Sequence, residues 1–476
     1  MLKEILREKV VNMKTYLLEH NGEIYIPNLP KNKRGYYQKE IDSILKNYKY
    51  NVICIEEELE KYNLYASACN CWGLKEEVFR YKLWNEAYLD NNINGFSLPI
   101  TVNTNDEYRK TLEKKFLEYI EYLNRPAFVY DKKTLEFIKN ECELILKIID
   151  NLIDGKDQCA GKMIENMLSS FKGESFFISE LDKSYSFRGI APFYELQREC
   201  DNNYAEMMDK ELTFYRVRTK KGDDKESITD IEHMLHLPYD LRDKADSMRF
   251  SVAGLPGLYL GTTTYVCSKE CKWNGTDKLY ASVFVPNSTG KKLKILNLTI
   301  SQALINGIYD RNSDANNAIR CKLQSDMLKI FPLVIATSFS VNNDEKVKYQ
   351  YLLSQALMRE ANKNGIDGIS YLSMKGENEF QYPQGVNIAI PAVDISEKNN
   401  YSKKCTGFNV SRPVMYDGQK GKKRASYINQ IYKQYDSNGS ESYTAKLNMD
   451  GKMEFYGDTV WGKFDDFLAE KVICKE

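Results

Sequence analysis

Hydrophobic and polar positions change their spacing along this chain. In the first 175 residues, apolar positions recur every three to four residues, which is typical of amphipathic helices. The first such segment places Leu2, Ile5, Leu6, Val10, Met13 and Leu17 on one stripe. The segments with this spacing are "LKEILREKVVNMKTYLLEH" (2–20), "NDEYRKTLEKKFLEYIEYL" (105–123), "DKKTLEFIKNECELILKIIDNLI" (131–153) and "GKMIENMLSSF" (161–171). We therefore predict a mainly helical region over residues 1–175, with a regulatory or oligomerisation role.

Short β-rich runs separated by turn residues follow from about residue 176. Two helices are also expected here, over 265–271 and 351–364. The expected strands are "TFYRVR" (213–218), "GLYLG" (257–261), "LYASVFVP" (279–286), "KLKILNLT" (292–299), "GIDGISYLS" (365–373) and "GVNIAIP" (385–391). A helical region followed by a mixed one predicts the α+β class, with helices flanking a sheet.

The last part of the chain, residues 401–476, differs in composition. It is basic and rich in tyrosine at first, and then "SYTAKLNMDGKMEFYGD" predicts a hairpin around Asp450-Gly451. A closing helix is expected over 461–473. The predicted division is therefore 1–175, 176–400 and 401–476, and a length of 476 residues suits two or three domains.

The charge balance argues against bulk electrostatic partners. Lysine and arginine total 67, as do aspartate and glutamate, so the formal net charge is zero. Nucleic acids and anionic membranes attract proteins with a net or strongly clustered positive charge. The basic stretch 419–427 is interpreted as a solvated loop. We expect neither nucleic acid nor membrane as a partner.

The start of the chain and the cysteine usage indicate a cytoplasmic protein. The first twenty residues alternate charged and apolar side chains, unlike a signal peptide. No run approaches the roughly 18 apolar residues of a membrane span. The 11 cysteines are odd in number and form no C-x-x-C pair, and only 3 histidines are present. We expect neither a disulfide framework nor a metal site.

Four short segments stand out as candidate chemistry: 215–218, 249–270, 365–373 and 385–391. Each has an ordinary explanation when taken alone. A strand arginine is usually solvated, a tyrosine between apolar residues is usually core, and a serine after an apolar run often ends a turn. Asn387 is more unusual, because asparagine is depleted in strands.

Together these segments fit the recognition and cleavage of a dinucleotide. Arg216 would offer a forked guanidinium to a phosphate. Glycines such as Gly254 allow a ligand to approach the backbone closely. Tyr259 would stack on a nicotinamide ring. A carboxylate, here Glu270, would stabilise the positive charge that develops on a ribose when its glycosidic bond breaks.

The same segments resemble the RES family, which is named for its Arg, Glu and Ser and shares a core with diphtheria-toxin-type ADP-ribosyltransferases. Its element R-x-S-x-x-G-x-P-x-x-Y-L is followed by Glu eleven residues after the Tyr. Here the matching residues are Arg249, Ser251, Gly254, Pro256, Tyr259 and Glu270, preceded by Tyr215-Arg216 and followed by "DGISYLS" (367–373) and Asn387. The stretch "HLPYDLR" (236–242) resembles the lead-in of longer members. The resemblance covers residues 212–392.

The resemblance implies a role for each matching residue. Arg216 would contact the pyrophosphate of NAD⁺, although Arg218 lies two residues on, on the same strand face. Glu270 would be the catalytic carboxylate and Tyr259 a nicotinamide or ribose contact. Ser373 would be a hydroxyl near the ribose. Asn387, Gly254, Arg249 and His236 would complete the nucleotide-binding site.

The family resemblance also implies a function. It predicts an ADP-ribosyltransferase-like split sheet and cleavage of the nicotinamide–ribose bond of NAD⁺, by hydrolysis or phosphorolysis. NAD⁺ would be the substrate, with no further cofactor. The protein would be a bacterial toxin held by an antitoxin, or an anti-phage defence effector. A homo-oligomer is expected separately, from the size of the helical region 1–175 and its lack of catalytic motifs. Two alternatives remain: ADP-ribosylation of a macromolecule, which Lys269 beside Glu270 disfavours, and a non-enzymatic nucleotide- or partner-binding module.

Overall fold

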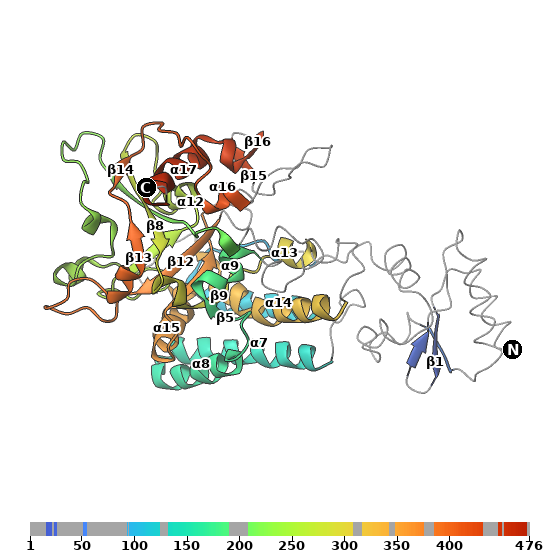
Figure 1. Ribbon diagram of the computed structural model, residues 1–476. Coiled ribbons are helices and arrows are strands. Elements are labelled where there is room, and N and C mark those ends of the chain that lie inside the picture. Colours follow the sequence, from blue (N-terminus) through green and yellow to red (C-terminus); the bar gives the residue numbers. More distant parts are fainter. Residues whose placement is uncertain are drawn as a thin grey trace, which may run out of the picture. The chain divides into compact units, whose positions relative to one another are not determined.

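The computed structural model contains helices and strands in mixed order (Figure 1). It describes residues 16–20, 23–25, 51–54, 93, 95–123, 132–189, 208–307, 317–341, 348–375, 385–431, 446–449 and 452–473. Its two compact units are Met1–Phe96 with Glu113–Glu143 and Gln302–Lys329, and Ser97–Leu112 with Leu144–Ser301 and Ile330–Glu476. The division of the sequence at 175 and 400 stays a prediction.

The described helices confirm most of the predicted ones. Those predicted over 105–123, 131–153 and 161–171 form, as do those at 265–271, 351–364 and 461–473. The α-helices are α6 (Asn105–Leu123), α7 (Lys132–Ile153), α8 (Asp157–Phe171), α9 (Tyr185–Arg188), α12 (Thr264–Glu270), α13 (Gln302–Gly307), α14 (Asn317–Thr337), α15 (Tyr349–Lys363), α16 (Tyr427–Ile431) and α17 (Val460–Ile473). The 3₁₀ turns are η3 (Leu181–Lys183), η4 (Ile231–Met234), η5 (Tyr239–Lys244), η6 (Gly290–Lys292), η7 (Lys403–Gly407) and η8 (Tyr456–Asp458).

The helix predicted over residues 2–20 is wrong in the part that the structure describes. Tyr16–His20 forms strand β1, which pairs antiparallel with β2 (Glu23–Tyr25) and β3 (Asn51–Cys54). Residues 2–15 of that prediction lie outside the described residues. The pairing with β3 joins segments more than thirty residues apart, so the apolar spacing of one segment does not reveal it.

The main sheet confirms the predicted strands. Within the described residues it has nine strands, in the order β13-β8-β6-β7-β12-β11-β9-β5, with β14 also paired to β8. Its strands are β5 (Ile178–Glu180), β6 (Phe214–Lys220), β7 (Gly257–Gly261), β8 (Lys278–Pro286), β9 (Lys294–Leu298), β11 (Gly368–Leu372), β12 (Val386–Pro391), β13 (Phe408–Val410) and β14 (Val414–Met415). Two smaller pairs are β4 (Ile100–Val102) with β10 (Phe339–Val341), and β15 (Lys446–Met449) with β16 (Lys452–Phe455), the predicted hairpin.

The sheet is divided between β6 and β7. These two strands share one residue pair, Tyr215 with Gly261, whereas β6 pairs with β8 along its whole length. Strand β7 pairs with β12 along its whole length as well. The two strands are therefore joined at one point and are free to diverge beyond it.

Two hydrophobic clusters pack against the sheet. Alternate residues of β8 enter different clusters, Tyr280 and Phe284 one, and Ala281 and Val283 the other. Such alternation is expected of a strand covered on both faces. Helices α12 and α17 belong to the second cluster, through residues that include Val266 of α12. The C-terminal helix thus contributes directly to the core beneath the sheet.

Helix α17 carries a buried acid, Asp465. Its Oδ1 accepts hydrogen bonds from the amide of Thr264 (3.1 Å) and from the Thr264 hydroxyl (2.5 Å). The Tyr456 hydroxyl lies 2.6 Å from Oδ2. The backbone carbonyl of Asp465 accepts from Tyr215 Oη (3.2 Å). Burial raises the pKa of the Asp465 carboxyl to about 8.

This raised pKa makes a testable contribution to stability. The folded chain keeps a proton that the unfolded chain releases near pH 4, so the free energy of unfolding falls as pH rises from about 4 to about 8. We expect the free energy of unfolding of Asp465→Asn to fall less over this pH range, because an amide does not titrate. Denaturant unfolding of both proteins at about pH 5 and about pH 8 measures it. An equal fall in the free energy of unfolding in both proteins would contradict the expectation.

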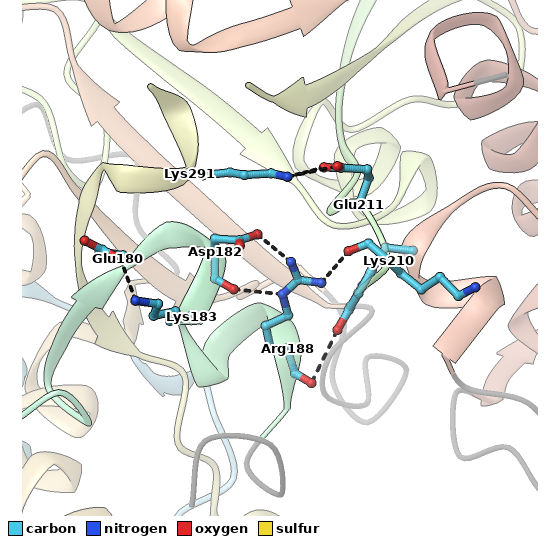
Figure 2. Close-up of polar contacts among 8 residues, drawn as sticks. Glu180, Asp182, Lys183, Arg188, Lys210, Glu211 and Lys291 are labelled. Atoms are coloured by element: carbon cyan, nitrogen blue, oxygen red, sulfur yellow. Dashed lines mark hydrogen bonds and ion pairs between the residues drawn. The ribbon is translucent and has the colours of Figure 1, made fainter. Parts of the chain in front are cut away.

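A buried arginine anchors the segment that leads into β6 (Figure 2). The Arg188 side chain of α9 donates to the carbonyls of Asp182 (2.8 Å) and Lys210 (2.6 Å) and pairs with the Asp182 carboxylate. Its guanidinium lies 5.0 Å from the ring centroid of Tyr427. Nearby, Lys291 pairs with Glu211 at 2.8 Å. These contacts tie α9 to residues 208–213, directly before β6.

Candidate functional site

A cleft of about 470 Å³ lies where the sheet divides. Three neighbouring strands contribute to its lining: Arg216 from β6, Tyr259 from β7 and Asn387 from β12. Glu270, the last residue of α12, lines it too. All these residues belong to the second compact unit. The strand order thus brings together residues that are up to 171 positions apart in the sequence.

Three of the predicted site residues meet at one atom. Glu270 Oε1 accepts a hydrogen bond from Ser373 Oγ (2.7 Å) and another from Asn387 Nδ2 (2.8 Å). Ser373 directly follows β11, and Asn387 lies opposite Tyr371 on the adjacent strand. Within the described residues, Glu270 Oε2 has no hydrogen-bond partner. One carboxylate oxygen is therefore held in place while the other is left for a ligand.

Helix α12 can approach the sheet closely because residue 261 is glycine. A Cβ at Gly261 would lie 2.6 Å from Val266 Cγ1, 2.7 Å from Cys267 Sγ and 3.1 Å from Asn387 Oδ1. The start of the helix is fixed by Thr263, whose hydroxyl accepts from the Val266 amide (3.1 Å). Gly261 thus permits the packing that presents Glu270 to Asn387.

We expect Gly261→Ala to destabilise the fold by about 1–3 kcal/mol, which is the usual range for overpacking. The added methyl group would displace α12, since the Val266 and Cys267 side chains are buried and have no room to withdraw. Denaturant unfolding of the variant and the wild type measures the difference. A stability equal to that of the wild type would show that α12 tolerates the shift.

Arg216 is buried and only partly paired. Its Nη1 donates to the Tyr259 carbonyl (3.3 Å), and its buried Nε has no partner among the described residues. Burial, with Arg218 nearby, lowers the Arg216 pKa to about 9. Arg218 differs, because its Nε and Nη2 donate to the carbonyls of His233 and Leu235, each at 3.2 Å. Of the two arginines in "YRVR", Arg216 donates to one backbone carbonyl and Arg218 to two, so more of the Arg216 guanidinium remains for an anion.

Arg249 forms one wall of the cleft. It donates to the Leu372 carbonyl (3.2 Å) and to Ser338 Oγ (2.9 Å), and its guanidinium lies 4.8 Å from the ring centroid of Tyr371. Its Nε is buried with no partner in the described residues. These contacts fix the guanidinium plane and leave one donor unused, as in Arg216.

Tyr259 lines the cleft with its ring held in place. Its hydroxyl shares a 2.8 Å hydrogen bond with Ser251 Oγ. Burial raises the Tyr259 pKa to about 12, so the phenol is neutral over the physiological range. A fixed, neutral aromatic face suits stacking against a flat ring.

Three predicted site residues are not part of the cleft lining: Ser373, which contacts the lining residue Glu270, and Gly254 and His236. Gly254 has a φ of +81° and occupies a turn, where its amide donates to the Ala245 carbonyl (3.0 Å). His236 is buried, with Nδ1 2.7 Å from the Leu237 carbonyl and Nε2 accepting from the Ser402 amide (2.8 Å). Both imidazole nitrogens are thus used by the backbone, and burial lowers the His236 pKa. Gly254 and His236 thus contact backbone groups outside the cleft, and their role in nucleotide binding stays a prediction.

The cleft is strongly cationic, which the sequence pattern did not reveal. Its charged lining residues are one carboxylate, Glu270, and six cations: Arg216, Arg218, Arg249, Lys272, Lys348 and Lys375. Tyr351 and Tyr371 line it as well. The lysines come from separate turns and helix starts, so no spacing rule connects them before the chain is folded. A cleft of this charge favours an anionic ligand.

Two features are absent from the residues that the structure describes. No group of three or more His, Cys, Asp or Glu side chains is placed to hold a metal ion. No helix in these ranges has both the length and the apolar character needed to cross a membrane.

The comparisons with known proteins give one relative whose name describes it as a toxin. No protein-family model matches the chain. The chain is similar to the "putative toxin YopC" of Bacillus subtilis (strain 168), with 24% identity over 330 residues that cover 67% of this chain and 68% of YopC. A chain in the crystal structure of the M. tuberculosis MbcT-MbcA toxin-antitoxin complex is 13% identical, with a TM-score of 0.22, over 43% of this chain and 84% of that one. A TM-score this low does not support an assignment of the fold.

Proposed function

We propose that this protein is an enzyme that cleaves the nicotinamide–ribose bond of NAD⁺. The observation that carries the proposal is the Glu270 carboxylate, held by Ser373 and Asn387 in a cleft lined by Arg216 and five further cations. A single carboxylate in a cationic cleft suits a substrate with an anionic pyrophosphate and a reaction that builds positive charge at one carbon.

The proposed reaction assigns a role to each residue around the cleft. The Arg216 guanidinium binds the pyrophosphate, and the Tyr259 ring stacks on the nicotinamide. As the C1′–N bond breaks, its electron pair leaves with nicotinamide, which becomes neutral. Glu270 stabilises the oxocarbenium-like ribose that results. Water or inorganic phosphate then adds to C1′, and the water route releases one proton.

The proposed architecture is an ADP-ribosyltransferase-like split sheet. It is supported by the single residue pair that joins β6 to β7 and by the placement of Arg216, Tyr259 and Asn387 on neighbouring strands at that point. The proposed biological role is that of a toxin that depletes NAD⁺, with an antitoxin as partner. Similarity to a protein named a putative toxin supports this role.

The fate of the ADP-ribose distinguishes the routes. NAD⁺ labelled in the adenine ring is incubated with the protein and a cell lysate, with and without phosphate. Free ADP-ribose is the expected product if water is the acceptor, and a phosphorylated ADP-ribose if phosphate is. Label retained on macromolecules would instead indicate ADP-ribosyl transfer. Glu270 is the one acid that lines the cleft within the described residues, which favours a small acceptor.

The cationic lining makes the KM for NAD⁺ sensitive to salt. The Debye length shortens from about 10 Å at 0.1 M to about 3 Å at 1 M ionic strength, so attraction of the anionic substrate weakens. We expect KM to rise with added NaCl while kcat changes little. Initial rates of nicotinamide release across a salt series measure both. A KM that is independent of salt would show that the cations do not attract the substrate.

A further inference from the structure

The C-terminal helix α17 is linked to the start of α12 by one buried acid. Asp465 accepts both the amide and the hydroxyl hydrogen of Thr264, and Tyr456 contacts its other oxygen. Asp465 is about 1% exposed, so these contacts are shielded from water. Thr264 is the first residue of α12, and Glu270 is the last.

Helix α12 is too short to hold its own position. It has seven residues, and isolated helices of that length are unstable in water. Its first amides also lack partners within the helix. Thr263 satisfies the Val266 amide, and Asp465 satisfies that of Thr264. Packing adds to this, since the rings of Tyr265 and Trp461 lie 5.6 Å apart.

We propose that Asp465 is a positioning residue: by holding the first turn of α12, it sets the place of Glu270 at the other end of that helix. Helix α17 then helps to position the Glu270 carboxylate through Asp465. This inference rests on the proposed function for the role of Glu270. The claim about α12 itself can be tested without any enzymatic activity.

The surroundings of Asp465 indicate how a conservative variant should behave. Asp466 lies next to it on α17, and the hydroxyls of Tyr215, Tyr456 and Thr264 contact it. Tyr456 Oη donates to Oδ2 of the ionised carboxylate; in the protonated acid the Oδ2 hydrogen takes the place of that donor and points at Tyr456 Oη, while Oδ1 still accepts both hydrogens of Thr264. Asparagine reproduces this pattern, with a carbonyl oxygen toward Thr264 and an amide toward Tyr456. Alanine removes all three contacts.

The chain offers a matched control in Asp466. It is also buried and accepts three hydrogen bonds, from the amides of Ala425 (3.0 Å) and Ser426 (2.8 Å) and from Asn429 Nδ2 (2.8 Å). These partners lie in α16 and the turn before it, not in α12. Asp466→Ala should therefore cost stability comparable to Asp465→Ala while leaving the first turn of α12 intact.

The test combines hydrogen exchange of the α12 amides with steady-state kinetics on full-length Asp465→Ala, Asp465→Asn and Asp466→Ala. For Asp465→Ala we expect faster exchange in α12 and a loss of kcat on the order of 100-fold with little change in KM, because a displacement of about 1 Å can have that effect. Asp465→Asn should restore both readouts. Asp466→Ala should keep the wild-type kcat and α12 exchange.

Thr264→Val supplies a milder variant if Asp465→Ala does not fold, since it removes the hydroxyl contact alone and should give a smaller change in the same direction. Wild-type exchange of α12 in Asp465→Ala, or an equal loss of kcat in Asp466→Ala, would overturn the proposal. Faster α12 exchange in Asp465→Ala, with no NAD⁺ cleavage even by the wild type, would support the positioning of α12 and reject the proposed function.

Discussion

Glu270→Gln is expected to reduce NAD⁺ cleavage by about 1,000-fold. The reason is electrostatic: the variant loses the negative charge that stabilises the ribose cation in the transition state, where a preorganised group of this kind contributes most. Glutamine keeps the size of the side chain and a carbonyl oxygen that accepts from Ser373 and Asn387. The fold and the binding of NAD⁺ should therefore persist. Rates of nicotinamide release, with thermal unfolding alongside, measure the effect.

Glu226→Gln is the matched control for this experiment. Glu226 is an exposed carboxylate of the same unit, with a 3.4 Å contact to Lys220, and it lies outside the cleft. Its neutralisation should leave the rate unchanged. A Glu270→Gln protein that cleaves NAD⁺ as fast as Glu226→Gln would remove Glu270 from the mechanism.

Arg216→Ala is expected to give the second largest loss. A hydrogen bond to a charged group contributes about 1.5–3 kcal/mol, so kcat/KM for NAD⁺ should fall by about 10- to 160-fold. Arg216→Lys should recover only part of this loss, because an ammonium group lacks the planar fork that matches a phosphate. Initial rates over a range of NAD⁺ concentrations give the values.

Arg218→Ala separates the two arginines of β6. Arg218 donates to the carbonyls of His233 and Leu235, so its removal should loosen η4 and affect stability more than kcat/KM. The assignment to Arg216 fails if Arg218→Ala has the larger effect on kcat/KM at equal folded fraction.

Much of the sheet and of the site was predictable from local patterns. Strands β7 and β12 were found because alternating or continuous apolar runs end at glycine or proline. The convergence of Glu270, Ser373 and Asn387 was expected from the family resemblance that the order and spacing of the short motifs carry. The six cations of the cleft were not, since Lys348 and Lys375 reach it from segments with no common pattern.

The elements that were missed depend on partners distant in the sequence. In the second half of α14, Ile330, Phe331, Leu333 and Val334 are all fully buried, so this half has no polar face, and Pro332 interrupts its pattern. The hydrogen bond from the Thr264 amide to Asp465 joins residues 201 positions apart, and no local sequence pattern indicates it. Such features depend on tertiary contacts, and the local pattern of a single sequence does not reveal those contacts.

Release of nicotinamide is the most direct test of the central claim. Purified full-length protein is mixed with NAD⁺, and free nicotinamide is followed with time beside the Glu270→Gln protein. The account predicts that the wild type releases nicotinamide in step with the loss of NAD⁺ and that the variant does not. Intact NAD⁺ in the presence of folded wild-type protein that binds it would contradict the account and indicate a nucleotide-binding module.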